Sequence, residues 1–245
     1  MHRSHCILVT LFVTSLALTS ARAEGPSTTS IGSGTGLLTG ASSSDCAPLI
    51  LRTDGGYENA ISWKNLGEWP PYWGAFADQF TGPLTVCGVA FDLTQIGNYN
   101  GQLANVYIWN DHLGQPGSVR YVATDLNLGE IATWPSIGRH VVEVVGGQYQ
   151  PGPFWVGIWG NWPEHVNGWF MAADQSGSTG ANPLTNVRAG IGFEPAGWQP
   201  VSSIVGWEAV TGLGIGILAS SPNPSGVPDA PIVAGSWGKV KSLYQ

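Results

Sequence analysis

Apolar and polar residues alternate with a period of two along much of this chain. Cys87, Val89 and Phe91 fall on one face of an extended segment, whereas Ala90 and Asp92 fall on the other. This period is typical of a β-strand with one face toward a core. We therefore expect a strand in this region, with Cys87 facing inward.

The same alternation, bounded by turn signals such as Asn100-Gly101 and Asn167-Gly168, predicts further strands. They span residues 104–109, 118–124, 139–145, 154–160, 169–173, 188–194 and 205–219. No segment sustains the apolar stripe and capping residues of an amphipathic helix. The pattern predicts an all-β fold, an antiparallel two-sheet β-sandwich of the jelly-roll type.

The N-terminus has the pattern of a secretory signal peptide. Arg3 precedes an apolar run from Ile7 to Leu18, and Ala21-Arg22-Ala23 has the small-x-small form of a cleavage site. We expect cleavage after Ala23 and a secreted or cell-surface protein. The alternative, an N-terminal membrane anchor, would need a run of about 20 apolar residues. After cleavage no membrane span is expected.

Composition divides the rest of the chain into a domain and its flanking segments. Residues 24–44 are rich in Ser, Thr and Gly and lack aromatic residues, so we expect a flexible lead-in. Residues 45–219 form the predicted β-sandwich domain. A Pro/Ser linker follows at 220–235, and a short segment that contains Trp237 and Tyr244 lies at 236–245.

The charge balance excludes one class of partner. Removal of Arg3 and Arg22 leaves seven basic residues against sixteen acidic ones, a net charge of −9. Binding of nucleic acid or of an anionic membrane needs clustered Lys and Arg. We therefore expect neither as a partner.

Two cysteines, Cys46 and Cys87, remain after cleavage. A cysteine pair in an exported protein most often forms a disulfide, and we expect one here. Closing this loop would stabilise the domain by about 4 kcal/mol on a chain-entropy estimate. The alternative is two unpaired buried thiols.

The chain has twelve Trp residues against nine Lys and Arg. In the strand 154–160, Trp155 and Trp159 lie on the face opposite the expected core. If this strand pairs with 104–109, the same outer face carries Tyr107 and Trp109. Flat rings beside amides suit the apolar faces and hydroxyls of sugars, so this face is a candidate polysaccharide surface.

A second group of rings lies in loops. Trp69, Tyr72 and Trp73 surround a Pro pair that would hold the loop rigid, and Trp162 precedes another proline. These residues are further candidates for ligand binding. The alternative is that the loop at 69–73 covers the outer-face rings as a second small core.

Candidates for metal binding and catalysis are few. Asp54 and Glu58 lie four residues apart, and their oxygens could hold Ca²⁺, although Asp-Gly-Gly is also ordinary turn chemistry. No other cofactor is expected. His112, His140 and His165 lack paired ligand spacing, and no nucleophile or phosphate-loop motif occurs. No catalytic residue is predicted, and Glu130, Glu143 and Glu194 could be proposed as glycosidase acids only by guesswork.

The chain resembles secreted bacterial β-sandwich proteins that carry a Pro/Ser linker and a short C-terminal sorting or docking segment. The resemblance covers three short stretches at 54–59, 151–157 and 236–244. It implies export, surface display and docking of the C-terminal segment to export or surface machinery, and it implies no reaction. The alternative for this segment is a tail without function.

Together these observations predict a non-catalytic protein that binds extracellular material. Its partner would be a polysaccharide or another surface component, contacted by exposed Trp and Tyr rings. The main alternative is a structural protein that assembles with itself and has no small ligand. A glycan-active hydrolase is a third hypothesis.

Overall fold

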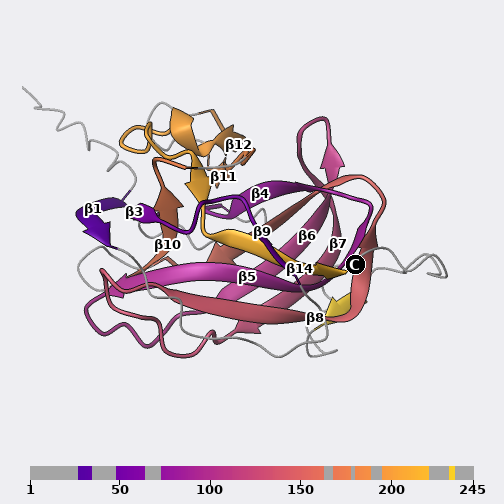
Figure 1. Ribbon diagram of the computed structural model, residues 1–245, viewed down its shortest axis with the longest axis horizontal. Coiled ribbons are helices and arrows are strands. Elements are labelled where there is room, and N and C mark those ends of the chain that lie inside the picture. The colour runs from indigo at the N-terminus through magenta and orange to yellow at the C-terminus, as the bar shows by residue number, and fades with distance from the viewer. Residues whose placement is uncertain are drawn as a thin grey trace, which may run out of the picture.

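The computed structural model describes residues 48–63, 73–162, 168–177, 180–188 and 195–220, together with the strands at 27–34 and 232–234. Two antiparallel sheets pack face to face (Figure 1), so the predicted all-β sandwich is confirmed. The described residues contain a single 3-10 turn, η1 (Val201–Ser203). None of their helical segments is long and apolar enough to cross a lipid bilayer.

The first sheet, called the β5 sheet, is built around the long central strand β5. Its strands are β1 (Ser27–Gly34), β3 (Tyr57–Ser62), β10 (Gly168–Asp174), β5 (Leu84–Ile96), β14 (Ile215–Ser220) and β2 (Leu49–Leu51), with β13 (Gly212–Leu213) beside β10 and β8 (Gly138–Gln150) beside β5. Strand β8 forms one side of this sheet. Its only partner among the named strands is β5.

The second sheet, called the β9 sheet, packs against the first. In order it contains β12 (Gly197–Pro200), β11 (Leu184–Val187), β4 (Phe76–Thr81), β9 (Pro153–Gly160), β6 (Ala104–His112), β7 (Gln115–Leu126) and β15 (Ile232–Ala234). From β3 to β10 the strand orders are β3-β10-β5-β8 and β4-β9-β6-β7. This alternation between two sheets is the jelly-roll arrangement that the turn-punctuated strands predict.

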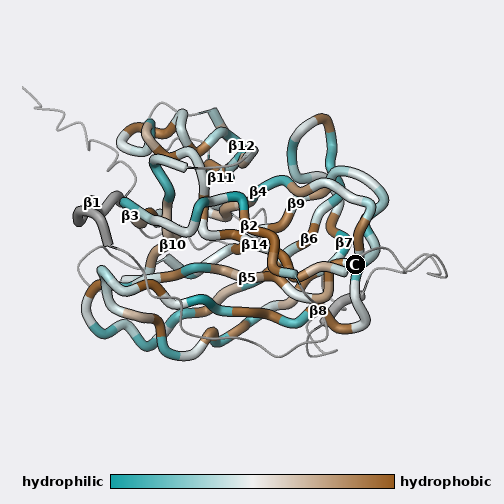
Figure 2. The backbone as a smooth tube through the Cα atoms, in the orientation of Figure 1, coloured by the Kyte–Doolittle hydropathy of each residue, from teal (hydrophilic) through white to brown (hydrophobic). Residues whose placement is uncertain are grey.

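The main core lies between the sheets. Apolar stretches gather along β14, β9 and β6 in the middle of the molecule (Figure 2). The inward residues of β6 and β9 are Ala104, Val106, Ile108, Phe154, Val156 and Ile158, all essentially buried, as the alternation predicts. Burial of each Val, Ile or Phe side chain among them contributes about 1.5 to 3 kcal/mol before entropy is counted.

The predicted orientation of Cys87 is wrong. Val89 and Phe91 face the main core as expected, but so does Val86, because a register shift between Val86 and Gly88 interrupts the alternation. Cys87 therefore lies half-buried on the other face, in a small cluster with Ala90. Cys46 lies outside the described residues, so its disulfide with Cys87 stays a prediction.

Two predicted strands differ from the structure. Most of the predicted strand 188–194 lies outside the described residues, and the strand observed there, β11, ends at Val187. Residues 201–211 form η1 and turns, so the strand expected at 205–219 starts at Gly212. Glycine turns such as Gly206, with a φ of 88°, interrupt the apolar pattern.

Short strands also occur in both flanking segments. β1 pairs antiparallel with β3, within the predicted lead-in, and β15 pairs parallel with β7, within the predicted linker. Each adds a strand at the margin of a sheet, where unpaired backbone groups would otherwise face solvent.

Candidate functional site

The four rings predicted to share the outer face of the β9 sheet do lie together. Strands β6 and β9 are antiparallel neighbours, and Trp109 pairs with Trp155 while Asn105 pairs with Trp159. The Tyr107 and Trp109 rings stack with their centroids 4.9 Å apart. A Cβ on Gly157 would collide with the Phe76 carbonyl oxygen of β4 and would lie 2.9 Å from the Trp109 ring, so a glycine is needed at this point of β9.

These four rings are buried, which agrees with the alternative of a second small core and not with the hypothesis of an exposed aromatic surface. Tyr107 and Trp155 are fully buried, and Trp109 and Trp159 retain only 3% and 4% exposure. They form a second core with Ala75, Ala77, Leu184 and the half-buried Trp198. The sequence pattern specifies the face of the sheet on which a ring lies, but not whether another segment covers that face.

Among the described residues, the margin of the β9 sheet supplies the cover. β11 and β12 extend the sheet beyond β4, and Trp198 of β12 packs edge-on against Trp109, with centroids 5.5 Å apart. β12 therefore curls back over the strands at the other side of the sheet. The loop at 69–73, expected to act as the cover, lies largely outside the described residues, which resume at Trp73.

A carboxylate anchors the second core at its polar margin. Asp111 Oδ1 accepts hydrogen bonds from Trp155 Nε1 and Gln79 Nε2, both at 2.8 Å. The bond from Trp155 gives its indole N–H an acceptor, without which this N–H would be buried and unpaired. The arrangement is that of a core. The faces of these rings are already packed, so a sugar could not stack on them.

Trp162 is also buried, at 1% exposure, and belongs to the main core. Its Nε1 donates to the Gly74 carbonyl oxygen at 2.7 Å, and its ring packs 4.3 Å from that of Trp169. Trp63, Trp207 and Phe76 complete an aromatic cluster at this end of the sandwich. The expectation of an exposed loop ring at Trp162 is therefore wrong.

One predicted loop ring keeps part of its surface in solvent. Trp73 is half-buried, whereas Trp69 and Tyr72 lie outside the described residues. The sugar-binding hypothesis therefore rests on this loop rather than on the outer face of the β9 sheet.

The two carboxylates proposed as metal ligands already accept hydrogen bonds within the protein. Asp54 Oδ1 accepts from the Gly56 amide at 2.7 Å, and Glu58 accepts from the Gln175 amide at 2.8 Å and the Ser176 hydroxyl at 2.6 Å. Burial raises the pKa of Glu58, but these hydrogen bonds outweigh it and the net pKa is lowered. Among the described residues no three His, Cys, Asp or Glu side chains are arranged to hold a metal ion, and calcium binding remains a prediction.

An ion pair lies on the outer face of the β5 sheet. Arg139 Nε and Nη2 donate to the two oxygens of Asp92, each at 2.7 Å, and the Tyr57 hydroxyl donates to Asp92 Oδ2 at 2.5 Å. Burial and the adjacent Asp92 carboxylate raise the pKa of Tyr57. This bidentate geometry satisfies the buried carboxylate from two sides, so we interpret it as structural.

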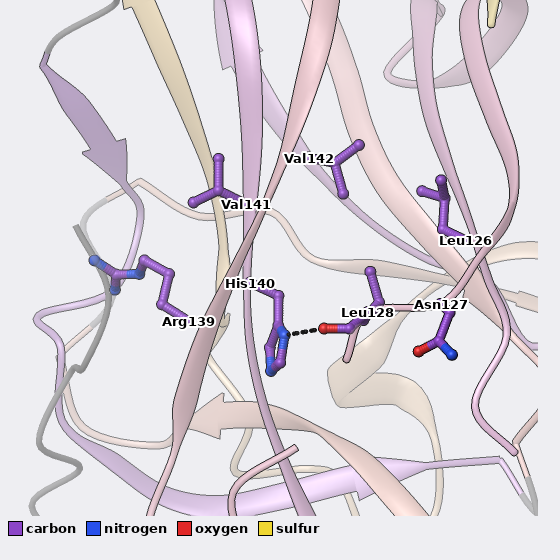
Figure 3. Close-up of a pocket in the computed structure, with 7 residues that line it drawn as sticks. All are labelled: Leu126, Asn127, Leu128, Arg139, His140, Val141 and Val142. Atoms are coloured by element: carbon purple, nitrogen blue, oxygen red, sulfur yellow. Dashed lines mark hydrogen bonds between the residues drawn. The ribbon is translucent and has the colours of Figure 1, made fainter. Parts of the chain in front are cut away.

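Sequence reasoning missed a cleft of about 410 Å³ between the end of β7 and the start of β8. It is lined by Leu126, Asn127, Leu128, Arg139, His140, Val141 and Val142. Figure 3 shows the His140 ring directed toward Leu128, with Arg139 on the opposite side of the strand. His140 Nδ1 lies 2.9 Å from the Leu128 carbonyl oxygen and donates to it, since a carbonyl oxygen can only accept. Burial lowers the pKa of the ring, which favours its neutral form.

The cleft opens onto the main core. Leu126, Leu128 and Val142 are half-buried and pack against that core from its side. No local signal could have identified this place, because residues 126–128 and 139–142 meet only through the topology of the two sheets. The chain matches no family model, no curated protein and no solved structure.

Proposed function

We propose that this protein is an exported, non-catalytic β-sandwich that serves as a structural component of extracellular material. The observation that carries this proposal is the burial of Tyr107, Trp109, Trp155 and Trp159 beneath β11 and β12. Rings used in this way stabilise a fold and leave no stacking surface for a ligand. Export is supported by the N-terminal pattern, which lies outside the described residues.

The low charge supports the same function. Only a tenth of the residues are charged, against about a quarter in a typical soluble domain. Electrostatic repulsion between copies is weaker when their surfaces carry few charges, so such copies can pack closely. The net negative charge of this chain limits how closely they pack. We therefore favour assembly into a larger material over steering of a charged ligand.

Sedimentation velocity of the mature chain over a hundredfold range of concentration tests the proposal. A structural component that assembles should show a sedimentation coefficient that rises with concentration. The side chains of Leu113 and Val205 are 92% and 66% exposed. Leu113→Ser and Val205→Ser, which replace these exposed apolar side chains by polar ones, serve as matched surface variants. A monomer at every concentration, together with retention on a polysaccharide, would contradict the proposal.

Polysaccharide binding by the loop at 69–73 is a second candidate. It is supported by the partial exposure of Trp73, next to Trp69 and Tyr72 in the sequence. Pull-down on insoluble polysaccharides should then retain the parent chain and lose Trp73→Ala, while Trp198→Ala, a ring of similar exposure that packs on the second core, serves as the control. Equal retention of both variants would exclude Trp73 as a sugar contact.

A further inference from the structure

The cleft between β7 and β8 lies where the two sheets separate. Among the strands that the structure describes, β8 is the last on its side of the β5 sheet, and β7 is followed by the short strand β15 alone in the β9 sheet. Tyr121 Oη donates to the Glu143 carbonyl oxygen at 3.1 Å and bridges the two margins. Beyond this hydrogen bond, Leu126, Leu128 and Val142 line the wall of the cleft.

The direction of β15 brings the C-terminal part of the chain toward this cleft. β15 is parallel to β7, with Ile232 paired to Tyr121 and Ala234 to Ala123. At Ala234 the backbone of β15 is therefore directed toward the Leu126 end of β7. If the register continued, Trp237 would lie level with Leu126, at the cleft wall.

The chemistry of the cleft complements that of the segment 235–245. The segment combines apolar Trp237, Val240, Leu243 and Tyr244 with Lys239 and Lys241, and it has no acidic residue. The cleft combines an apolar wall with exposed carboxylates nearby in the sequence, namely Asp125, Glu130 and Glu143. Burial lowers the pKa of His140 and so disfavours its charged form, and the charge of Arg139 is paired with that of Asp92.

We propose that the segment 235–245 binds to the cleft of its own chain, with Trp237 against Leu126 and Leu128 and the lysines toward the exposed carboxylates Asp125, Glu130 and Glu143. Burial of these apolar side chains would close the side of the main core that the two sheets leave open. The segment would thus form part of the folded domain, in contrast to a free docking tail.

Hydrogen exchange of the intact mature chain tests this binding. The parent is compared with Trp237→Ala and with Ser242→Ala, a polar control in the same segment. We expect amides at 126–128 and 139–143 to exchange about tenfold faster in Trp237→Ala and at the parental rate in Ser242→Ala. Amides at 184–187 monitor the second core and should exchange equally in all three chains, which separates loss of docking from loss of the fold.

Two outcomes would overturn the proposal. One is an unchanged rate at the cleft in both Trp237→Ala and a Leu128→Asp variant that retains its fold. The other is parental protection that disappears on dilution in parallel with a fall in mass, because the segment would then bind to the cleft of a second copy. Protection that is independent of concentration and is lost in Trp237→Ala supports binding within one chain.

Discussion

The two sheets cover their outer faces by different chemistry. The outer face of the β9 sheet carries stacked and edge-on rings beneath β11 and β12. The outer face of the β5 sheet carries the buried Asp92–Arg139 pair and Tyr57, beside small residues such as Ala60 and Ala172. The first face is stabilised by apolar area and packing, and the second depends on complete pairing of its charges.

The segments that cover the two outer faces also differ. Part of the outer face of the β5 sheet lies beneath the connection from β7 to β8, which packs Trp134 and Ile137 onto Phe170. That connection is fixed by backbone bonds, since the Gln95 amide donates to Ala132 and the Trp134 amide donates to Gln95. Over the β9 sheet, the part of the cover that the structure describes consists of β11 and β12, with the side chains of Leu184 and Trp198. The comparison teaches that an outward-facing residue in a sandwich is exposed only if no other segment of the chain lies over it.

The largest effect should come from the aromatic face. Trp155→Ala removes a fully buried ring and its hydrogen bond to Asp111. We expect the free energy of unfolding to fall by about 4 to 5 kcal/mol, the upper range for deletion of a large buried side chain. Urea denaturation measures this loss. A change below about 1 kcal/mol, within the range of surface substitutions, would mean that the ring is not part of a core.

The ionic face should respond strongly to loss of one partner and weakly to loss of both. Arg139→Met leaves the Asp92 carboxylate buried without its cation, and we expect a loss of about 3 to 4 kcal/mol. The double variant Asp92→Leu with Arg139→Met should recover most of this stability. Thermal unfolding of the two single variants and the double variant gives the coupling energy, and additive losses would contradict a buried pair.

A pH dependence at alkaline values distinguishes the two faces further. The pKa of Tyr57 is higher in the folded protein than the unfolded value of 10.0. Above pH 10 the unfolded chain therefore releases a proton that the folded chain retains, and this group lowers stability as pH rises, by about 1.4 kcal/mol per unit. The stability of Tyr57→Phe should fall less steeply between pH 10 and 11 than that of the parent. Trp155→Phe should keep the parental dependence of stability on pH. Parallel slopes for Tyr57→Phe and the parent would contradict the assignment.

The smallest effect should come from the cover of the aromatic face. Trp198 is half-buried and packs on the edge of Trp109. Trp198→Ala should cost about 1 to 2 kcal/mol and increase quenching of Trp fluorescence by acrylamide. Trp198→Phe, which keeps an aromatic edge, serves as the matched control. If quenching of Trp198→Ala does not exceed that of the control, β12 is not the cover.

Much of the sandwich could be predicted from the sequence because its strands follow local alternation. The inward and outward faces of β6 and β9, and the pairing of these two strands, agree with the pattern of Val106, Ile108, Val156 and Ile158. The face of Cys87 could not be predicted, since the bulge at 86–88 depends on its partners in β8 and β14. A register shift of this kind leaves little trace in a strand's own sequence.

The candidate site could be predicted only in part. The four outer-face rings do cluster, because period-two geometry sets their face. Their burial follows from Leu184 and Trp198, which lie far away in the sequence, and no alternation along β6 or β9 encodes that contact. The cleft beside His140 likewise depends on the meeting of two sheet margins, so it could be recognised only after the fold was known.

Hydroxyl-radical footprinting of the native mature chain, read by mass spectrometry, tests the central claim most directly. The claim is that Tyr107, Trp109, Trp155 and Trp159 stabilise a second core and do not form a binding surface. We predict that these four residues are oxidised far more slowly than exposed Leu113 and half-buried Trp73, and that the difference disappears in denaturant. Oxidation of Trp109 or Trp155 in the native chain as fast as that of Trp73 would contradict the account.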